Sequence, residues 1–239
     1  MSIEENVALV RRNIASAAAE AGRNAGEILL VAATKMNDAG RIQRAIAAGV
    51  DVCGENRVQE MLEKNALGAY RGAPLHFIGH LQKNKVRQVV GLAALIHSVH
   101  SRALLEEISQ IAEKRGIIQD VLLEVNIGGE ASKSGFSPED IPAALEFSAR
   151  LPALRTRGLM AIPPICAFPE ENRPYFLRMK QLFVDNAAKK YDNVCMDFVH
   201  GHVRRLHRSG ELRGEHGQGR QRHFRRTCLR LASLEAKHV

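Results

Sequence analysis

A lysine at the end of an apolar run is the residue in this sequence best suited to chemistry. Lys35 follows residues 28–34, which are seven non-ionic residues in a row. Such a run is typical of a strand buried on both faces of a parallel sheet, and α/β proteins build their sites at the carboxyl ends of these strands. A partly desolvated amine at that position can attack an aldehyde and form a Schiff base. The alternative is a lysine that extends from the strand end into water.

Polar residues also follow other predicted strands. Asn56 comes after a short strand at 50–53, and His80 comes at the turn after a strand at 75–78. Because the carboxyl ends of parallel strands lie on one side of a sheet or barrel, both residues are expected on the same rim as Lys35. Each could contact a ligand, or could simply cap the helix that follows it.

Two further segments also allow a functional or a structural interpretation. Residues 126–136 form a polar, glycine-rich stretch after a strand predicted at 121–125. This stretch could line a ligand or be only a long turn. Met160 lies in an apolar strand predicted at 156–162, where it could pack in the core or touch the ring of a ligand.

The elements that must position these residues alternate along the chain. Amphipathic helical patterns separate the predicted strands, and a leading helix begins with a capping box formed by Ser2 and Glu5. Strands that alternate with helices predict a parallel sheet, and their number favours a single (β/α)8 barrel over an open sheet. Strand patterns occur at 28–35, 50–53, 75–78, 94–99, 121–125, 156–162 and from 194 onward.

The composition fits one globular domain without a metal site. The 239 residues are 45% hydrophobic and contain no transmembrane run, so a single barrel of this length is ordinary. The four cysteines lie far apart and have no metal-ligand spacing, which argues against a zinc site or a disulfide framework. The first residues show no signal peptide. We expect a reduced, cytoplasmic, monomeric protein that has no membrane partner.

The positive charge is confined to the end of the chain. The formal net charge is +8, but residues 198–239 contain nine Arg and one Lys against three Glu, so the first 197 residues are close to neutral. Nucleic-acid binding could therefore rest only on this tail. The tail has no interleaved aromatic residues and no nucleic-acid-binding motif, so no nucleic-acid partner is expected.

Six segments of the sequence, taken in order, resemble the pyridoxal phosphate homeostasis proteins of the YggS or PROSC type. Proteins of that family form a single barrel similar to the N-terminal domain of alanine racemases, and the resemblance runs from about residue 5 to Asp197. The six segments are Thr34-Lys35, Gly54-Glu55-Asn56 with 58–60, residues 76–85, residues 96–99, residues 125–127 with 132–136, and residues 157–164.

The resemblance implies a cofactor and a set of site residues. It makes Lys35 the Schiff-base lysine for pyridoxal 5'-phosphate (PLP), places Asn56 and Met160 among the residues that line the cofactor, and puts His80 at the rim of the site. It implies no metal and no catalytic residue. The family is thought to bind and buffer PLP for PLP-dependent apoenzymes, so this chain is expected to be a non-catalytic carrier.

An amino-acid racemase of the same barrel type is the alternative. That activity would need a second domain or a catalytic tyrosine positioned across from Lys35, and the sequence shows neither.

The resemblance stops at Asp197, and a frame change accounts for the sequence beyond it. The family would continue close to Leu-Ser-Met-Gly-Met-Ser-Gly-Asp, and GC-rich codons for the last seven of these residues, read one base out of frame, translate as residues 199–205. We therefore expect a barrel domain at 1–197 and an out-of-frame basic tail at 198–239. This tail would replace the last strand or strands and the phosphate-binding segments, which would leave the barrel incomplete at its C-terminal end and impair PLP binding.

Overall fold

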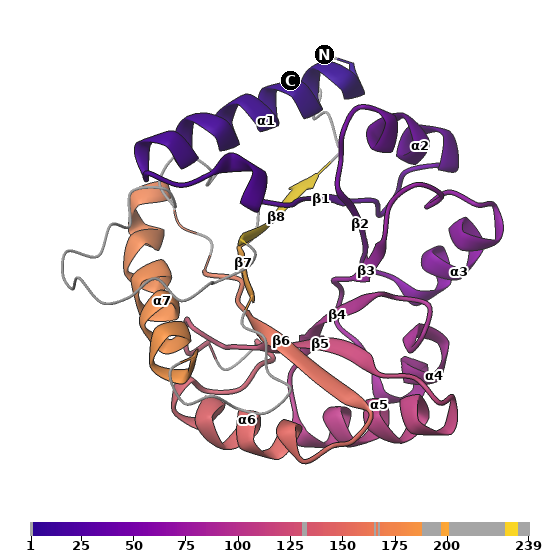
Figure 1. Cartoon of the computed structure of the whole chain (residues 1–239), viewed down its shortest axis with the longest axis vertical. Helices are drawn as coiled ribbons and strands as arrows, with labels where there is room; N and C mark the ends of the chain where they lie inside the picture. Colours follow the sequence, from indigo (N-terminus) through magenta and orange to yellow (C-terminus); the bar gives the residue numbers. More distant parts are fainter. Residues whose placement is uncertain are drawn as a thin grey trace.

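The computed structural model describes residues 2–130, 133–164, 166, 168–187, 197–200 and 228–233. Their strands form a closed parallel barrel in which each strand lies beside the next one in sequence (Figure 1). The (β/α)8 prediction is therefore confirmed. The strands are β1 Leu30–Ala33, β2 Val52–Glu55, β3 Leu75–Phe77, β4 Leu95–Val99, β5 Gln119–Glu124, β6 Leu154–Met160, β7 Asp197–His200 and β8 Cys228–Ser233.

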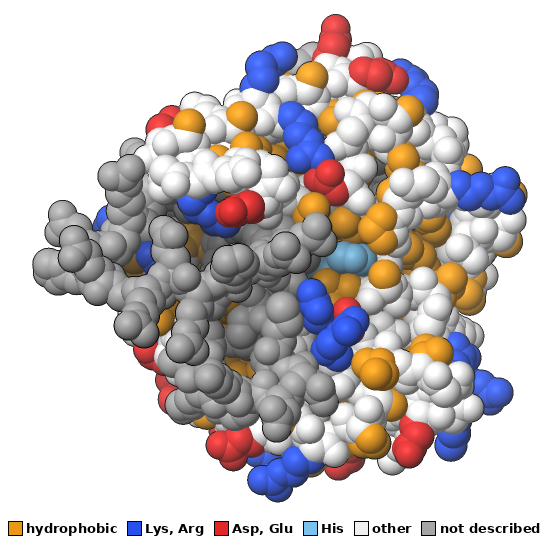
Figure 2. Space-filling view, viewed as in Figure 1, with side chains coloured by type: hydrophobic (Ala, Val, Ile, Leu, Met, Phe, Trp, Pro, Cys, Tyr) orange, Lys and Arg blue, Asp and Glu red, His pale blue; other side chains and the backbone are white. Residues whose placement is uncertain are grey.

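Helices surround the ring of strands, and α1 lies outside β8 and β1 (Figure 1). Among the described residues, no helix is long and apolar enough to cross a lipid bilayer. Many acidic and basic side chains lie around the periphery, as Figure 2 shows from the same direction. The helices are α1 Ile3–Glu20, α2 Ala39–Ala47, α3 Val58–Ala66, α4 Val86–Val89, α5 Arg102–Lys114, α6 Ile141–Ala149 and α7 Arg173–Ala187. Short 3-10 turns occur at η1 Ala25–Glu27, η2 Lys83–Lys85, η3 Pro138–Asp140 and η4 Pro169–Asn172.

Local signals in the sequence set the beginnings of the first elements. The predicted capping box is present at the start of α1, where Glu5 N donates to Ser2 Oγ at 3.1 Å and Ser2 N donates to Glu5 Oε2 at 2.7 Å. The first strand begins at Leu30, two residues later than its apolar run, because Ile28 still closes the preceding 3-10 turn.

The tail contributes two strands, which corrects the expectation of an incomplete barrel. β7 pairs with β6, and β8 pairs with both β7 and β1, all in parallel. The physical reason is that β1 would otherwise present an open edge of unpaired N–H and C=O groups, which the backbone of Arg230–Ser233 now covers. The expected loss of the phosphate-binding segments concerns residues that lie mainly at 201–227, outside the described part of the chain.

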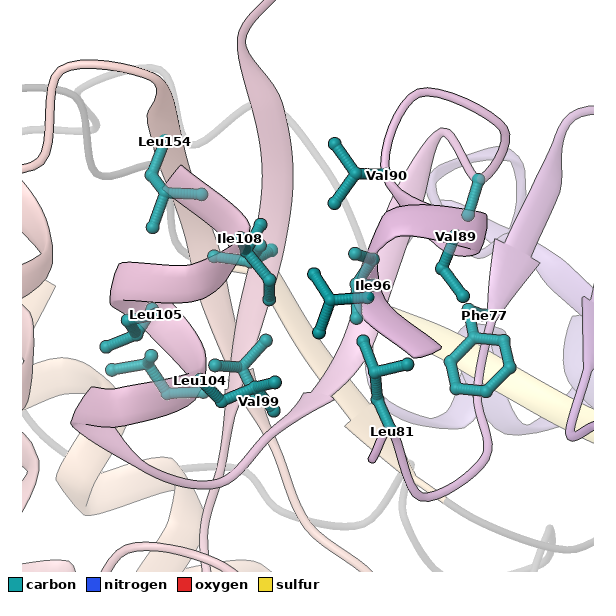
Figure 3. Packing of buried hydrophobic residues seen from close by; sticks show 14 of the residues in the cluster. Phe77, Leu81, Val89, Val90, Ile96, Val99, Leu104, Leu105, Ile108 and Leu154 are labelled. Atoms are coloured by element: carbon teal, nitrogen blue, oxygen red, sulfur yellow. The ribbon is translucent and has the colours of Figure 1, made fainter. Parts of the chain in front are cut away.

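The core has two layers because side chains alternate across each strand. The larger layer lies between the strands and the helices, where Phe77 and Ile96 of the barrel meet Leu81 and Leu105 of the surrounding segments (Figure 3). The smaller layer contains the inward-facing residues of five strands. Its members are Val31, Val52, Leu95, Leu122 and Met160.

Candidate functional site

Lys35 lies at the C-terminal mouth of the barrel, two residues beyond the end of β1. The N–H of Thr34 still donates to Gly54 O at 2.8 Å, so the pairing of β1 with β2 continues to this point. Because Val31 belongs to the interior layer, alternation directs Ala33 and then Lys35 toward the same interior. Lys35 is partly buried. Its amine makes no hydrogen bond or ion pair with any described residue.

Helix α3 holds the backbone on both sides of Lys35. Lys64 Nζ donates to the carbonyl oxygen of Thr34 at 2.8 Å. The amide of Met36 donates to Glu60 Oε2 at 2.9 Å, and the same oxygen lies 2.7 Å from Lys64 Nζ. The hydrogen bond from Lys64 lowers the pKa of the Glu60 carboxyl. The two peptide groups that flank Lys35 are therefore both hydrogen-bonded to one ion pair on a neighbouring helix, and Asn37 bonds their carbonyl oxygens as well.

A fully buried carboxylate completes this ion pair. Glu55, at the end of β2, is 0% exposed, and its Oε2 lies 2.7 Å from Lys64 Nζ and 3.0 Å from Thr34 Oγ1. The hydroxyl of Tyr70 donates to the same oxygen at 3.4 Å, and burial raises the pKa of Tyr70. Glu55 and Glu60 belong to a segment that carries the family resemblance, but neither they nor Lys64 were predicted to be site residues.

The residues after β2 and β3 pack directly against each other. A Cβ atom on Gly79 would overlap the backbone carbonyl of Asn56, so only glycine allows this approach. The hydroxyl of Ser98 donates to the carbonyl oxygen of Gly79. Asn56 caps no helix, since the N-cap of α3 is Arg57. Its Oδ1 is buried and has no hydrogen-bond partner among the described residues, so this amide is available to a ligand.

The barrel interior also contains polar side chains that the sequence reasoning missed. Nδ1 of His76 lies 2.9 Å from Nε2 of His97. Burial lowers the pKa of His76 to about 4 and lowers that of His97 as well, so both rings are neutral at pH 7. Burial also raises the pKa of Glu124, on β5. His97 Nδ1 and Glu124 Oε2 are buried without a partner among the described residues. The sequence pattern that could have identified these residues is a polar side chain at an inward-facing position of an otherwise apolar strand.

The remaining predicted residues divide between the interior and the rim. Met160 is 3% exposed and packs in the interior layer. His80 is exposed, with its ring stacked on that of His100 at a centroid distance of 4.7 Å and its Nδ1 3.4 Å from Ser134 Oγ. His80 caps no helix, because Gln82 is the N-cap of the following turn. Met160 thus lies in the interior layer and His80 is exposed, while Lys35 and Asn56 follow the carboxyl ends of β1 and β2.

The mouth of the barrel suits a small aromatic aldehyde better than a metal ion. Within the described residues Lys35 offers an unpartnered amine, Asn56 offers a buried acceptor, and the barrel interior holds five apolar side chains beside its buried histidines. No group of three His, Cys, Asp or Glu side chains within the described ranges could hold a metal.

Known proteins share this sequence and fold. The family model of the alanine racemase N-terminal domain matches residues 6–202. The pyridoxal phosphate homeostasis protein of Aquifex aeolicus is 40% identical over 192 residues, which cover 80% of this chain and 84% of the relative. An unknown protein from Bifidobacterium adolescentis has a crystal structure that is 32% identical, with a TM-score of 0.83 over 96% of this chain and 92% of that one.

A solved relative is known in a form that contains PLP. PipY of Synechococcus elongatus with PLP bound is 26% identical, with a TM-score of 0.72 over 93% of this chain and 97% of that one. The family model and the curated relative each cover most of the chain. This chain therefore belongs to the pyridoxal phosphate homeostasis proteins, a family built on the alanine racemase N-terminal fold.

Proposed function

We propose that this chain binds PLP at the C-terminal mouth of its barrel, through the amine of Lys35, and holds it as a cytoplasmic store for PLP-dependent apoenzymes. The names of its relatives and the PLP bound to PipY support this function. The observation that carries the proposal is the amine of Lys35, which lies two residues beyond the first barrel strand and has no partner among the described residues.

The difference between two lysines supports Lys35 as the attachment residue. The ammonium of Lys64 donates to three oxygens at 2.7 to 2.8 Å, which uses all of its N–H groups, whereas Lys35 makes no such contact with a described residue. A nucleophile must offer a free, unprotonated amine. The nitrogen of Lys64 is occupied by its three acceptors, so Lys35 is the reactive amine at this end of β1.

Three other residues would contact the cofactor in this proposal. When bound, PLP supplies an aldehyde carbon that condenses with a lysine amine and releases water. The side-chain amide of Asn56 would hydrogen-bond the ligand, because its Oδ1 is buried and unpartnered within the described residues. Met160 would provide an apolar contact from the interior layer, and His80 would contribute from the rim.

A carrier fits the described interior better than a racemase does. Racemisation needs a second acid or base across the ligand from Lys35. Tyr70 is engaged with Glu55, and its raised pKa disfavours proton exchange. His76 and His97 are hydrogen-bonded to each other and have pKa values below the physiological range. We propose that the chain turns over no amino acid.

Borohydride trapping tests the attachment residue. The purified full chain is incubated with PLP, reduced and digested, and the labelled peptide is identified by mass spectrometry. We expect the label on Lys35 and none on Lys64, which serves as the internal control. A label only on other lysines, or no label at all, contradicts the proposal. An alanine racemisation assay on the same sample is expected to show no conversion.

We also propose that residues 198–239 are an out-of-frame product. The support is the codon reading at 199–205 together with the charge of +7 that this segment carries. Resequencing the gene across the Asp197 codon tests the proposal. An intact frame that still encodes this tail would contradict it.

A further inference from the structure

We propose that Lys64 and Glu60 of α3 are positioning residues for Lys35. In this inference their ion pair fixes the peptide groups before and after Lys35 in the conformation that directs its amine into the barrel. The inference rests on the proposed function, since it assigns a role in PLP attachment to two residues that do not touch the cofactor. We call these two residues, together with Glu55 at the end of β2, the α3 clamp.

The geometry of the clamp leaves Lys64 little freedom. An ammonium has three N–H donors, and those of Lys64 meet Thr34 O, Glu55 Oε2 and Glu60 Oε2 at 2.8, 2.7 and 2.7 Å. Lys64 is 9% exposed and Glu55 is 0% exposed, so water does not replace the bond between them, whereas Glu60 is partly exposed. The position of the carbonyl of Thr34, which precedes Lys35 directly, is therefore tied to the position of α3.

The other side of Lys35 depends on the clamp even more strongly. Met36 has φ = 58°, and no other non-glycine residue of the described ranges has a positive φ. This left-handed conformation is unfavourable for a residue with a side chain. Packing does not compensate, since Met36 is 73% exposed. A turn hydrogen bond from Asn37 N to Thr34 O, at 3.1 Å, spans Met36, and the amide of Met36 itself donates to Glu60 Oε2 at 2.9 Å.

A positioned amine matters because covalent attachment requires the reacting atoms to meet in one geometry. An ordered backbone on both sides removes conformations of Lys35 in which the amine points into water, and this raises the fraction of the chain ready to bind. The clamp also explains why α3 carries a buried lysine. A buried ion pair is weak support for stability alone, but it can fix one conformation of the segment it contacts.

The test compares two glutamates of the same helix. Glu60→Ala removes the acceptor of the Met36 amide. Glu63→Ala is the matched control, because Glu63 is exposed and its carboxylate hydrogen-bonds only Gln59 among the described residues. Glu60→Gln keeps an oxygen for the Met36 amide but loses the charge. PLP affinity is measured on each full-length chain by absorbance titration, and the circular dichroism of the bound cofactor reports its orientation.

We expect Glu60→Ala to weaken PLP binding about tenfold and to change the dichroism of the bound cofactor, because a hydrogen bond to a charged group is lost. Glu60→Gln should recover part of the affinity, and Glu63→Ala should bind like the parent chain. In cofactor-free protein, hydrogen exchange at the Met36 amide should become faster in Glu60→Ala while the amides of β5 stay protected. A purely structural role would instead accelerate exchange throughout the barrel.

The outcomes separate this inference from the proposed function. If the parent chain takes no label at Lys35, the proposed function fails. If the parent chain is labelled at Lys35 but Glu60→Ala binds PLP within twofold and keeps the protection of the Met36 amide, only the clamp inference fails. Because removal of Lys64 alone would leave Glu55 unpaired, the double variant Glu55→Gln/Lys64→Met tests the other half of the clamp and is also expected to weaken PLP binding.

Discussion

Nδ1 of His76 lies 2.9 Å from Nε2 of His97 inside the barrel, so a single proton lies between the two rings. Both histidines are buried, at 8% and 1% exposure. Burial disfavours the imidazolium form, which lowers the pKa of His76 to about 4 and lowers the pKa of His97. This pair makes the stability of the fold depend on pH in a defined direction.

The first prediction concerns the fold at mildly acidic pH. In the unfolded chain both histidines have the ordinary pKa of about 6.5, so between about pH 4 and 6.5 the unfolded state binds more protons than the folded state. His76 therefore makes its full contribution to the free energy of unfolding above pH 6.5. As the pH falls toward 4, this contribution is lost, and the free energy of unfolding decreases by on the order of 3 kcal/mol. Urea unfolding at several pH values measures it. The variant His76→Gln should flatten this dependence, and an unchanged slope would contradict the prediction.

The second prediction concerns the carboxyl of Glu124, whose Oε2 is buried without a hydrogen-bond partner in the described part of the chain. Burial raises its pKa in the folded state, so the folded chain binds the proton more tightly than the unfolded chain does. The protonated carboxyl therefore makes its full contribution to the stability of the fold below about pH 4.5, and this contribution is lost as the pH rises through the raised pKa. Glu124→Gln stays neutral, and we expect it to be about 1 kcal/mol more stable than the parent chain at pH 8 and equal to it near pH 4. Greater stability of the parent at pH 8 would exclude this account.

The third prediction concerns the contact between Gly79 and Asn56. A methyl group at Gly79 would overlap the Asn56 carbonyl, so Gly79→Ala must move the loop after β2 or β3. We expect the free energy of unfolding of Gly79→Ala to be lower by about 1 to 3 kcal/mol, which is the cost of an overpacked site, and we expect weaker PLP binding. Gly40→Ala, in α2, is the control, because the nearest atom to its added Cβ is 3.3 Å away. Calorimetry compares the two variants, and equal melting temperatures would show that the loops adjust freely.

The fourth prediction concerns the tail. If residues 198–239 are out of frame, a frame-restored chain regains serine and glycine segments whose backbone N–H groups can cradle a phosphate. We expect it to bind PLP at least about tenfold more tightly than the present chain, from two or more charge-assisted hydrogen bonds. Pyridoxal, which has no phosphate, should bind the two chains equally. If both chains prefer PLP over pyridoxal by the same factor, the hypothesis that the tail is out of frame is contradicted.

Much of the fold could be predicted from local patterns. The apolar run before Lys35 predicted a buried strand and its carboxyl end, and the capping box at Ser2 predicted the first helix; both are present. The β5 and β6 strands lie within two residues of their predicted positions. These patterns are readable because a helix and a strand repeat with different periods, so the spacing of apolar residues reports the element and its buried face.

The sequence by itself determined the order of strands and helices and the place of Lys35 at the end of the first strand. Only the tertiary structure decided what surrounds that lysine. Lys64 reads as a helix lysine, and its contact with Thr34 spans thirty residues of sequence. β8 completes the barrel although its sequence lies in a segment without clear periodicity. The physical reason is that periodicity reports which face of an element is buried, whereas contacts between distant residues depend on the strand register and on the packing of each helix against the barrel.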